Sequence, residues 1–227
     1  MAKGKKFTRK ELNKPDQFIS TTDMVLAYCS KHKTGLIFVV TAVVLVVFSA
    51  LWVRYNQNIN SLRMEALYFK VEKIKAQNGF SPREIVGKIE NLLNEFSEGP
   101  QKQRAIMILA DQYYEIRAYD RAISLYQDIL NETSPSTFPY QLASIGVAYS
   151  LEGKKDYKGA IVAYKTIIES HNKYPLFHVY LSLARCYEFN DNHNSALLTL
   201  REMNTRFLNH PKIELVESRL KRLEKLA

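Results

Sequence analysis

Cysteine is scarce in this chain, because only Cys29 and Cys186 occur among its 227 residues. The two flank a long apolar run at residues 35–53, so a membrane crossed by that run would hold them on opposite sides. No disulfide can then join them within one chain, which excludes a disulfide-stabilised fold. We expect Cys186 to be a small apolar packing residue.

Catalytic motifs are missing as well. The sequence has no G-x-x-x-x-G-K-[ST], G-x-G-x-x-G, H-E-x-x-H or G-x-S-x-G pattern. The histidines at 171, 178, 193 and 210 are not spaced three or four residues apart, so no helix face offers a metal site. The net charge of +9 comes without a groove-reading motif, so nucleic acid is not an expected partner. The sequence therefore predicts a protein that is not an enzyme and has no metal or cofactor.

The longest stretch without charge runs from Gly35 to Val53, nineteen residues that also lack amide side chains and proline. As a helix it would be about 28 Å long, which matches the hydrocarbon core of a bilayer. A buried core helix would show a polar stripe, and this run has only Thr41 and Ser49. A cleaved signal peptide would be shorter and closer to the N-terminus. We expect an uncleaved transmembrane helix, with Trp52 at its outer boundary.

The orientation follows from the distribution of basic residues. Before the run stand eight basic residues against three acidic ones, whereas the twenty residues after it contain four basic ones. Cationic residues near a span stay on the cytoplasmic side, and a basic tail is also attracted to anionic lipid. The sequence predicts a single-pass protein of the inner membrane with a cytoplasmic N-terminus and a periplasmic C-terminal part. The eight residues are Lys3, Lys5, Lys6, Arg9, Lys10, Lys14, Lys31 and Lys33.

The segments on either side of the span have their own signals. Residues 1–18 are polar and should be extended or disordered, and residues 20–23 offer N-caps for a short helix that leads into the membrane. Beyond the span, neither Gly nor Pro occurs before Gly79, so the helix should continue to about residue 77 as a rigid stalk. Apolar residues recur along it in steps of four and three, at Tyr55, Ile59, Leu62, Ala66 and Phe69. Ser81 and Pro82 should cap the next helix.

One pattern then occurs three times. Its copies are Ile106-x2-Leu109-Ala110-x2-Tyr113 with Ala122-x3-Tyr126, Leu142-x2-Ile145-Gly146-x2-Tyr149 with Ala160-x3-Tyr164, and Tyr180-x2-Leu183-Ala184-x2-Tyr187 with Ala196-x3-Leu200. The pattern resembles the tetratricopeptide repeat, a pair of antiparallel helices in which small residues permit close packing. Residues 149–160 are two longer than the equivalent stretch at 113–122, so we expect an enlarged turn at 153–156.

The resemblance implies an all-α fold. We expect a transmembrane helix that continues into a solenoid of three to four helix pairs and a capping helix. Residues 56–97 form a degenerate extra unit whose first helix is the stalk, and an apolar stripe at 213–223 marks the cap. The expected divisions are 1–34 (cytoplasmic arm), 35–53 (transmembrane helix), 54–78 (stalk), 79–211 (repeats) and 212–227 (capping helix).

In tetratricopeptide arrays, four positions of each first helix line a concave groove that binds protein partners. Carried onto this sequence, the positions form a lining of aromatic, aliphatic and charged side chains without the Lys- and Asn-rich clamp for acidic chaperone C-termini. The alternative is a groove that is solvated or filled by the protein's own flanking helices. The positions are Arg104, Met107, Asp111 and Tyr114; Tyr140, Ala143, Val147 and Ser150; and His178, Leu181, Arg185 and Glu188.

The overall plan is similar to the bacterial ancillary subunit of the Sec translocon, in which periplasmic repeats link secretion to chaperones. This resemblance implies an adaptor that binds translocon, chaperone or envelope-complex subunits at the membrane. A second function stays open, that of a structural subunit of a larger envelope machine, in which the repeats assemble with neighbours or with copies of themselves. Large constant assemblies in detergent would favour the second function, and small partner-dependent species the first.

Overall fold

The computed structural model describes residues 17–77, 79–170 and 176–225, with side chains from residue 23 onward. Regular structure in these ranges consists of ten α-helices. The chain forms two compact units, residues 1–60 and 61–227. Most of the arm that was predicted to be extended, residues 1–16 of 1–18, lies outside the described residues.

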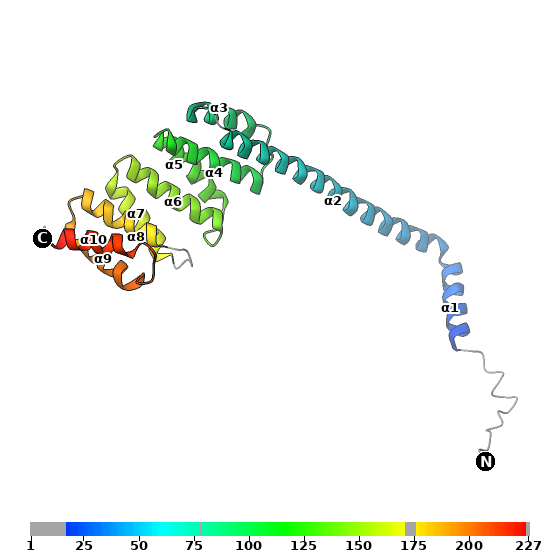
Figure 1. Ribbon diagram of the computed structural model, residues 1–227. Helices are drawn as coiled ribbons and strands as arrows, with labels where there is room; N and C mark the ends of the chain where they lie inside the picture. Colours follow the sequence, from blue (N-terminus) through cyan, green and yellow to red (C-terminus); the bar gives the residue numbers. More distant parts are fainter. Residues whose placement is uncertain (1–16, 78, 171–175, 226–227) are drawn as a thin grey trace, which may run out of the picture. The chain divides into compact units, whose positions relative to one another are not determined.

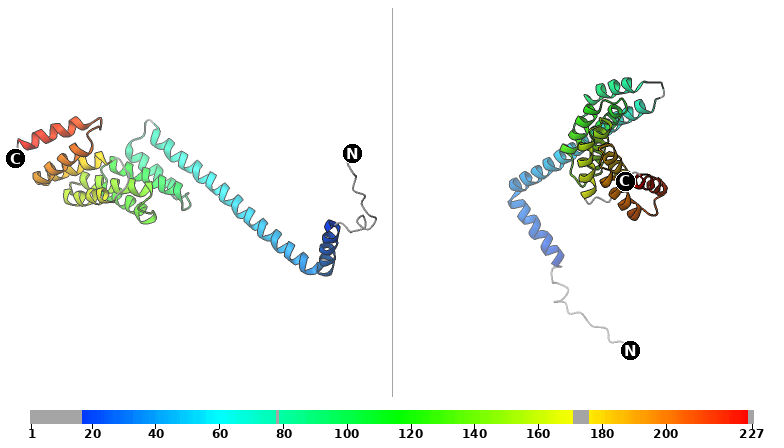
Figure 2. Two further views of the ribbon diagram at one scale, coloured as in Figure 1. Left: turned by 90° about the horizontal axis from the view of Figure 1, so that it is seen from below. Right: turned by 90° about the vertical axis from the view of Figure 1, so that its left-hand side faces the viewer.

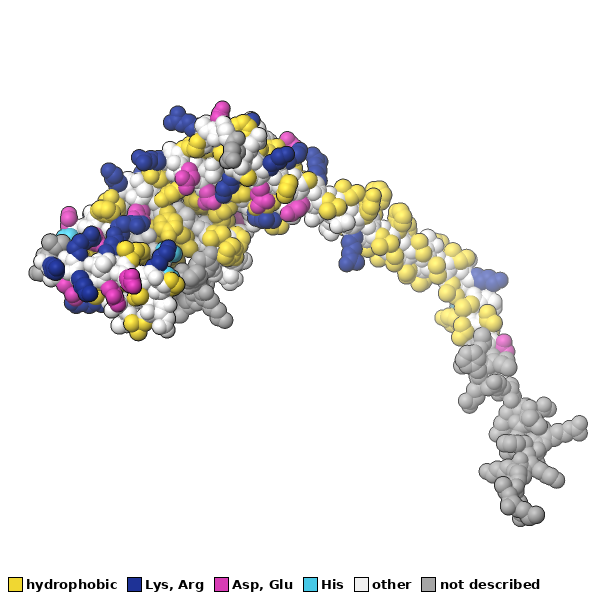
Figure 3. Space-filling model, viewed as in Figure 1, with side chains coloured by type: hydrophobic (Ala, Val, Ile, Leu, Met, Phe, Trp, Pro, Cys, Tyr) yellow, Lys and Arg dark blue, Asp and Glu magenta, His cyan; other side chains and the backbone are white. Residues whose placement is uncertain are grey.

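The first unit contains helix α1 (Gln17–Lys31) and most of the apolar helix α2 (Lys33–Ala76). Helix α1 begins before the N-caps expected at residues 20–23, so those residues lie inside it. Thr41 Oγ1 donates to the carbonyl of Ile37 at 2.7 Å and Ser49 Oγ to that of Val46 at 2.9 Å, as predicted for hydroxyls that bond back to their own helix. The apolar side chains of the run are exposed (Figure 3).

Helix α2 continues without a break to Ala76, close to the expected residue 77. Among the described residues it is the one helix that is long and apolar enough to cross a membrane, and none of its most apolar window is buried. Its last turns belong to the second unit and bury Met64, Leu67, Tyr68 and Val71. These residues pack with side chains of the next two helices, so α2 also serves as the first helix of the solenoid.

Helix α3 (Pro82–Leu93) starts with the predicted Ser81 cap and Pro82 in the first turn, and the structure adds a capping box with Glu84. The Ser81 side chain accepts a hydrogen bond from the Glu84 backbone N–H, and Glu84 Oε2 accepts one from the Ser81 N–H at 2.7 Å. The Ser81 N–H, and with it the Ser81 hydroxyl, donates to the Glu84 carboxylate and lowers its pKa, because these two bonds favour the charged form. Gly79, with φ at 111°, occupies the left-handed conformation between α2 and α3 that glycine adopts without strain.

The remaining helices form three antiparallel pairs and a final single helix (Figures 1 and 2). Each of these helices packs against its neighbours in the chain, and the first helices of the first two pairs, α4 and α6, also touch. The pairs are α4 (Pro100–Glu115) with α5 (Tyr119–Glu132), α6 (Phe138–Gly153) with α7 (Tyr157–Glu169), and α8 (Phe177–Phe189) with α9 (His193–Arg206), followed by α10 (Ile213–Glu224). This arrangement is an α-solenoid.

The turns inside the three pairs have the same length, so the enlarged turn expected at residues 153–156 is wrong. Each turn has three residues, and the middle one, Arg117, Lys155 or Asp191, has φ between 56° and 67°. In each turn the middle N–H and the following N–H bond back to carbonyls of the first helix, which is the Schellman ending of a helix.

These equivalent turns give a structural alignment of the repeats that differs from the sequence alignment. Seven residues before the middle turn residue stand Ala110, Ala148 and Ala184, which are all fully buried. The small residue of the second repeat is therefore Ala148 and not Gly146. The sequence alignment places helix α6 two residues out of register with α4 and α8. The two extra residues lie between Ala122 and Ala148, a stretch two residues longer than the equivalent one from Ala160 to Ala184, and not in the turn between α6 and α7.

The second helices follow the sequence alignment. Ala122, Ala160 and Ala196 are each fully buried, as predicted for positions at close helix contacts. Helix α10 buries Val216 and Leu223 against the core and packs Ile213 and Leu220 partly against it, so the predicted apolar stripe faces inward. Apart from Leu215, its exposed side chains are polar or charged, which suits a helix that ends a solenoid.

Candidate binding groove

The corrected alignment changes which residues of α6 occupy groove positions. The two-residue shift replaces Tyr140, Ala143, Val147 and Ser150 by Leu142, Ile145, Tyr149 and Glu152. Burial agrees with the shift, because Ala143 and Ser150 are fully enclosed. Tyr140 and Val147 line a separate cavity of about 470 Å³ that also contacts α5 and α7.

The corrected residues of α6 meet the predicted residues of α4 in one cleft. This α4–α6 cleft has a volume of about 580 Å³. It brings together three predicted residues, Met107, Asp111 and Tyr114, and three that the sequence alignment missed, Leu142, Ile145 and Tyr149. The same four helix positions, counted from a correctly placed turn, identify the missed residues. The rest of the lining is Lys75, Gln112, Glu115, Tyr126 and Gly146.

Tyr126 from α5 supplies a buried aromatic wall of the cleft. Its hydroxyl donates a 2.7 Å hydrogen bond to Asp111 Oδ1, and burial raises its pKa. Its ring lies so close to Gly146 that a Cβ added there would come within 2.5 Å of the ring. Gly146 is therefore required for close approach to Tyr126, a role different from the one assigned by the sequence alignment. The hydrogen bond holds the Asp111 carboxylate in a defined position at the cleft.

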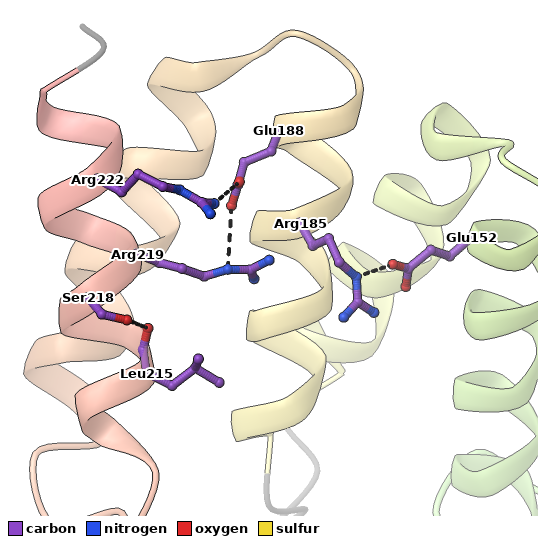
Figure 4. A network of polar contacts seen from close by, with 7 residues as sticks. All are labelled: Glu152, Arg185, Glu188, Leu215, Ser218, Arg219 and Arg222. Atoms are coloured by element: carbon purple, nitrogen blue, oxygen red, sulfur yellow. Dashed lines mark hydrogen bonds and ion pairs between the residues drawn. The ribbon is translucent and has the colours of Figure 1, made fainter.

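The surface next to Tyr149 carries a polar network between α6 and α8 (Figure 4). Glu152 at the end of α6 pairs with Arg185 Nε on α8, and Arg185 Nη2 donates to Ser182 Oγ at 3.1 Å. Tyr164 from α7 donates to the other Glu152 oxygen at 2.8 Å. The hydrogen bond to Glu152 raises the pKa of Arg185, so the guanidinium remains charged at neutral pH.

The predicted groove residue Glu188 contacts the C-terminal helix. Its Oε2 lies 2.9 Å from Arg222 Nη2, and its Oε1 lies 4.0 Å from Arg219 Nε, both on α10 (Figure 4). The third repeat therefore uses Arg185 to contact α6 and Glu188 to contact α10 of its own chain. Here the structure resembles the alternative in which flanking helices occupy the groove.

The other predicted positions lie in different surroundings. Arg104 is stacked on the Tyr68 ring, with its Cζ 3.8 Å from the ring centroid, and lies 3.6 Å from Glu65 on α2. Leu181 is buried in the core, whereas His178 is exposed, with its ring 6.4 Å from that of His210. The twelve predicted positions are thus divided among the α4–α6 cleft, the separate cavity of Tyr140 and Val147, ion pairs between helices, the buried core and, for His178, the exposed surface.

The titratable side chains near the groove lie in different surroundings. Within the described ranges no three His, Cys, Asp or Glu side chains are grouped to hold a metal ion. Cys186 is fully buried, and burial raises its pKa to about 12, which keeps the thiol protonated and unreactive. The α4–α6 cleft instead combines aliphatic and aromatic walls with the carboxylates of Asp111 and Glu115 and the amine of Lys75.

The helix pairs, their small-residue contacts and their turns define a tetratricopeptide-like solenoid. Solved structures agree with this class. Tetratricopeptide-like repeats of the kinesin light chain type from Podospora anserina superpose with a TM-score of 0.58 at 17% identity, covering 72% of this chain and 86% of that one. Their Q17M variant gives a TM-score of 0.59 at 17% identity, covering 72% and 85%. The RS-1 MamA ArsTM double mutant gives 0.50 at 14% identity, covering 71% and 94%. No protein-family model and no curated protein sequence matches the chain.

Proposed function

We propose that this chain is a non-enzymatic adaptor, anchored in the inner membrane, that binds protein partners on its periplasmic repeat unit. The observation that carries the proposal is the α4–α6 cleft, where six groove-position side chains from two repeats line one cavity. The envelope-biogenesis or secretion setting draws on the anchor-plus-repeat plan described above.

The lining of the cleft indicates what a partner should carry. Met107, Leu142 and Ile145 offer an apolar surface, and Tyr114 and Tyr149 are only partly buried, so their rings remain available for contact. Asp111 and Glu115 place two carboxylates beside this surface. A partner segment with an apolar or aromatic side chain next to a basic one would complement both features.

Binding is tested by site-specific photo-cross-linking in native membranes. We expect a photoreactive residue at Tyr149 to form a discrete adduct that mass spectrometry identifies as another protein. The control is the same residue at Val162 on α7, which is 66% exposed and outside the cleft. Leu142→Glu should weaken the adduct without unfolding the protein, because Leu142 is only partly buried. Equal adducts at both positions, or an adduct indifferent to Leu142→Glu, would remove the support for the cleft.

The anchor is supported by the length and composition of α2 and by the basic residues before it. A reporter that is active only outside the cytoplasm, fused after Ala227, should be active. A cytoplasm-only reporter at the same point should be silent. The reverse pattern would contradict the orientation and the periplasmic location together.

A structural subunit of a larger envelope assembly is the second candidate. It is favoured by the third repeat, where Arg185 and Glu188 already contact α6 and α10 and leave less groove for a transient partner. Size measurement of the detergent-solubilised protein separates the two functions. A constant large assembly supports the structural role, and a small species that grows only with partner supports the adaptor.

A further inference from the structure

The second-unit part of α2 has two apolar faces, and only one of them is used by the fold. Met64, Leu67 and Val71 are buried against α3 and α4. On another face of the same turns, Leu62 is 64% exposed and Phe69 is 68% exposed, with exposed Ala66 between them. The apolar residues that predicted this helix are therefore not the ones that build its contact with the repeats.

The exposed residues form a regular seam. Tyr55, Ile59, Leu62, Ala66 and Phe69, here called the α2 seam, follow one another in steps of four, three, four and three on one unbroken helix. All five are exposed. This spacing is that of the a and d positions of a coiled coil, with Ile59 and Ala66 at a and the other three at d. The next a position is Lys73, so the apolar seam ends there.

Charges on the two flanks of the seam have opposite sign. Arg63 and Lys70 occupy the e positions, and Glu65 and Glu72 occupy the g positions. In a parallel two-stranded coiled coil, each g residue lies beside the e residue of the next heptad on the other strand. Glu65 of one chain would thus lie beside Lys70 of its twin, twice per pair. An antiparallel pair would place like charges together, so the pattern favours parallel strands.

We infer that the α2 seam binds the seam of a second copy of this chain, forming a parallel two-stranded contact. The flanking charges carry the choice of occupant, because they complement the same helix in parallel orientation. A shared membrane anchor would also impose that orientation and raise the local concentration, which offsets the shortness of the seam. This last step rests on the proposed membrane span.

Cysteine cross-linking of the full chain in native membranes tests the inference. In a Cys29→Ser background, Ala66→Cys places a thiol on the seam, and Ser61→Cys places one on an exposed position outside it. Both replacements are nearly isosteric, and the remaining Cys186 is fully buried in each. Under mild oxidation we expect a disulfide-linked dimer for Ala66→Cys and none for Ser61→Cys, because only seam positions face each other closely enough.

A further variant controls for random collision in the membrane. Adding Leu62→Glu and Phe69→Glu to Ala66→Cys should abolish the dimer while the thermal midpoint stays within a few degrees, because both side chains are exposed. Equal dimer at positions 61 and 66, dimer that survives the double glutamate change, or an adduct with a different protein overturns the inference. A dimer at position 66 in a protein that the topology reporters place elsewhere supports the seam and contradicts the anchor. If the reporters give the expected topology but position 66 forms no dimer, the anchor is supported and the seam is contradicted.

Discussion

Tyr164 on α7 donates a 2.8 Å hydrogen bond to Glu152 at the end of α6. The equivalent tyrosine one repeat earlier, Tyr126, donates a 2.7 Å bond to Asp111. In both repeats a buried phenol from the second helix reaches a carboxylate at a groove position of the first helix. The third repeat has Leu200 in place of the phenol, and its groove carboxylate Glu188 is held by arginines of α10 instead. Groove carboxylates are thus positioned by the chain itself.

The pair of Glu152 and Arg185 should stabilise the contact between the second and third repeats. Arg185→Met leaves the mostly buried Glu152 without its cation, so we expect the free energy of unfolding to fall by about 1–3 kcal/mol. We expect a loss at the lower end of this range, because the Arg185 side chain is 37% exposed and water screens the ion pair. A double-mutant cycle with Glu152→Gln, followed by thermal unfolding, measures the coupling. Additive effects of the two changes would show that the pair contributes nothing.

Ala160 should tolerate no larger side chain. It is fully buried at the start of α7, where the helices of the second pair approach each other. Ala160→Leu should overpack this contact and destabilise the protein by about 1–3 kcal/mol. Val162→Leu on the same helix is the matched control, since Val162 is exposed and should leave the thermal midpoint unchanged. Equal midpoints for the two variants would mean that α7 does not pack tightly at Ala160.

The all-α solenoid followed from local signals that lie within one helix or one turn. Ser81 and Pro82 mark the start of α3, and the buried alanines of the second helices recur at a regular spacing in the sequence. The register of α6 could not be read in this way, because Gly146 with Tyr149 and Ala148 with Leu151 both offer a small residue three positions before a large one. The register is decided by Lys155, which adopts the left-handed conformation at the turn. Lysine rarely adopts this conformation, so the sequence does not indicate it.

The contacts that groove side chains make within the chain could not be predicted from the sequence for a different reason. Arg185 contacts Glu152 thirty-three positions away, and Glu188 contacts Arg222 thirty-four positions away. Such pairs depend on how successive repeats rotate against one another, which no local pattern encodes. The exposed face of α2 is a similar case. A periodic apolar stripe predicts a helix, but it does not say which neighbour covers the stripe.

Alkaline pH should destabilise the repeat unit. Burial raises the pKa of the Cys186 thiol from its ordinary 9.0 to about 12, and burial with the Glu90 hydrogen bond raises that of Tyr113 from 10.0 to about 12. The unfolded chain therefore loses these protons at lower pH than the folded one. The stabilisation is complete below pH 9 and is lost as the pH rises toward 12. Urea unfolding across this range should show the decline.

The thiol contribution is separable from that of the phenol. Cys186→Ala should flatten part of the decline, and Tyr113→Phe should flatten another part. In the unaltered protein a thiol reagent at pH 8 should modify Cys186 only after denaturant is added, because the side chain is fully buried. Rapid modification of Cys186 in the folded protein would contradict the burial on which the pH dependence rests.

The three turns also predict a stabilising substitution. The N-cap residue, which stands just before each second helix, has nearly the same backbone conformation in all three pairs. Its φ/ψ is −83°/59° at Ala118, −80°/72° at Asp156 and −98°/68° at Asn192. Asp156 accepts a hydrogen bond from the Gly159 N–H at 3.0 Å and Asn192 accepts one from the Ser195 N–H at 3.1 Å, whereas alanine has no acceptor. Ala118→Asn should therefore add the missing cap.

We expect Ala118→Asn to stabilise the protein by about 0.5–2 kcal/mol, because the backbone already has the conformation that an N-cap requires. Asparagine is preferred to aspartate here, since Glu115 and Asp120 already place negative charge close to residue 118. The matched control is Asp156→Ala, which removes the equivalent cap from α7 and should lower the thermal midpoint by a similar amount. If Ala118→Asn lowers the midpoint while Asp156→Ala also lowers it, the two turns are not equivalent, and the structural alignment that shifts α6 by two residues loses its basis.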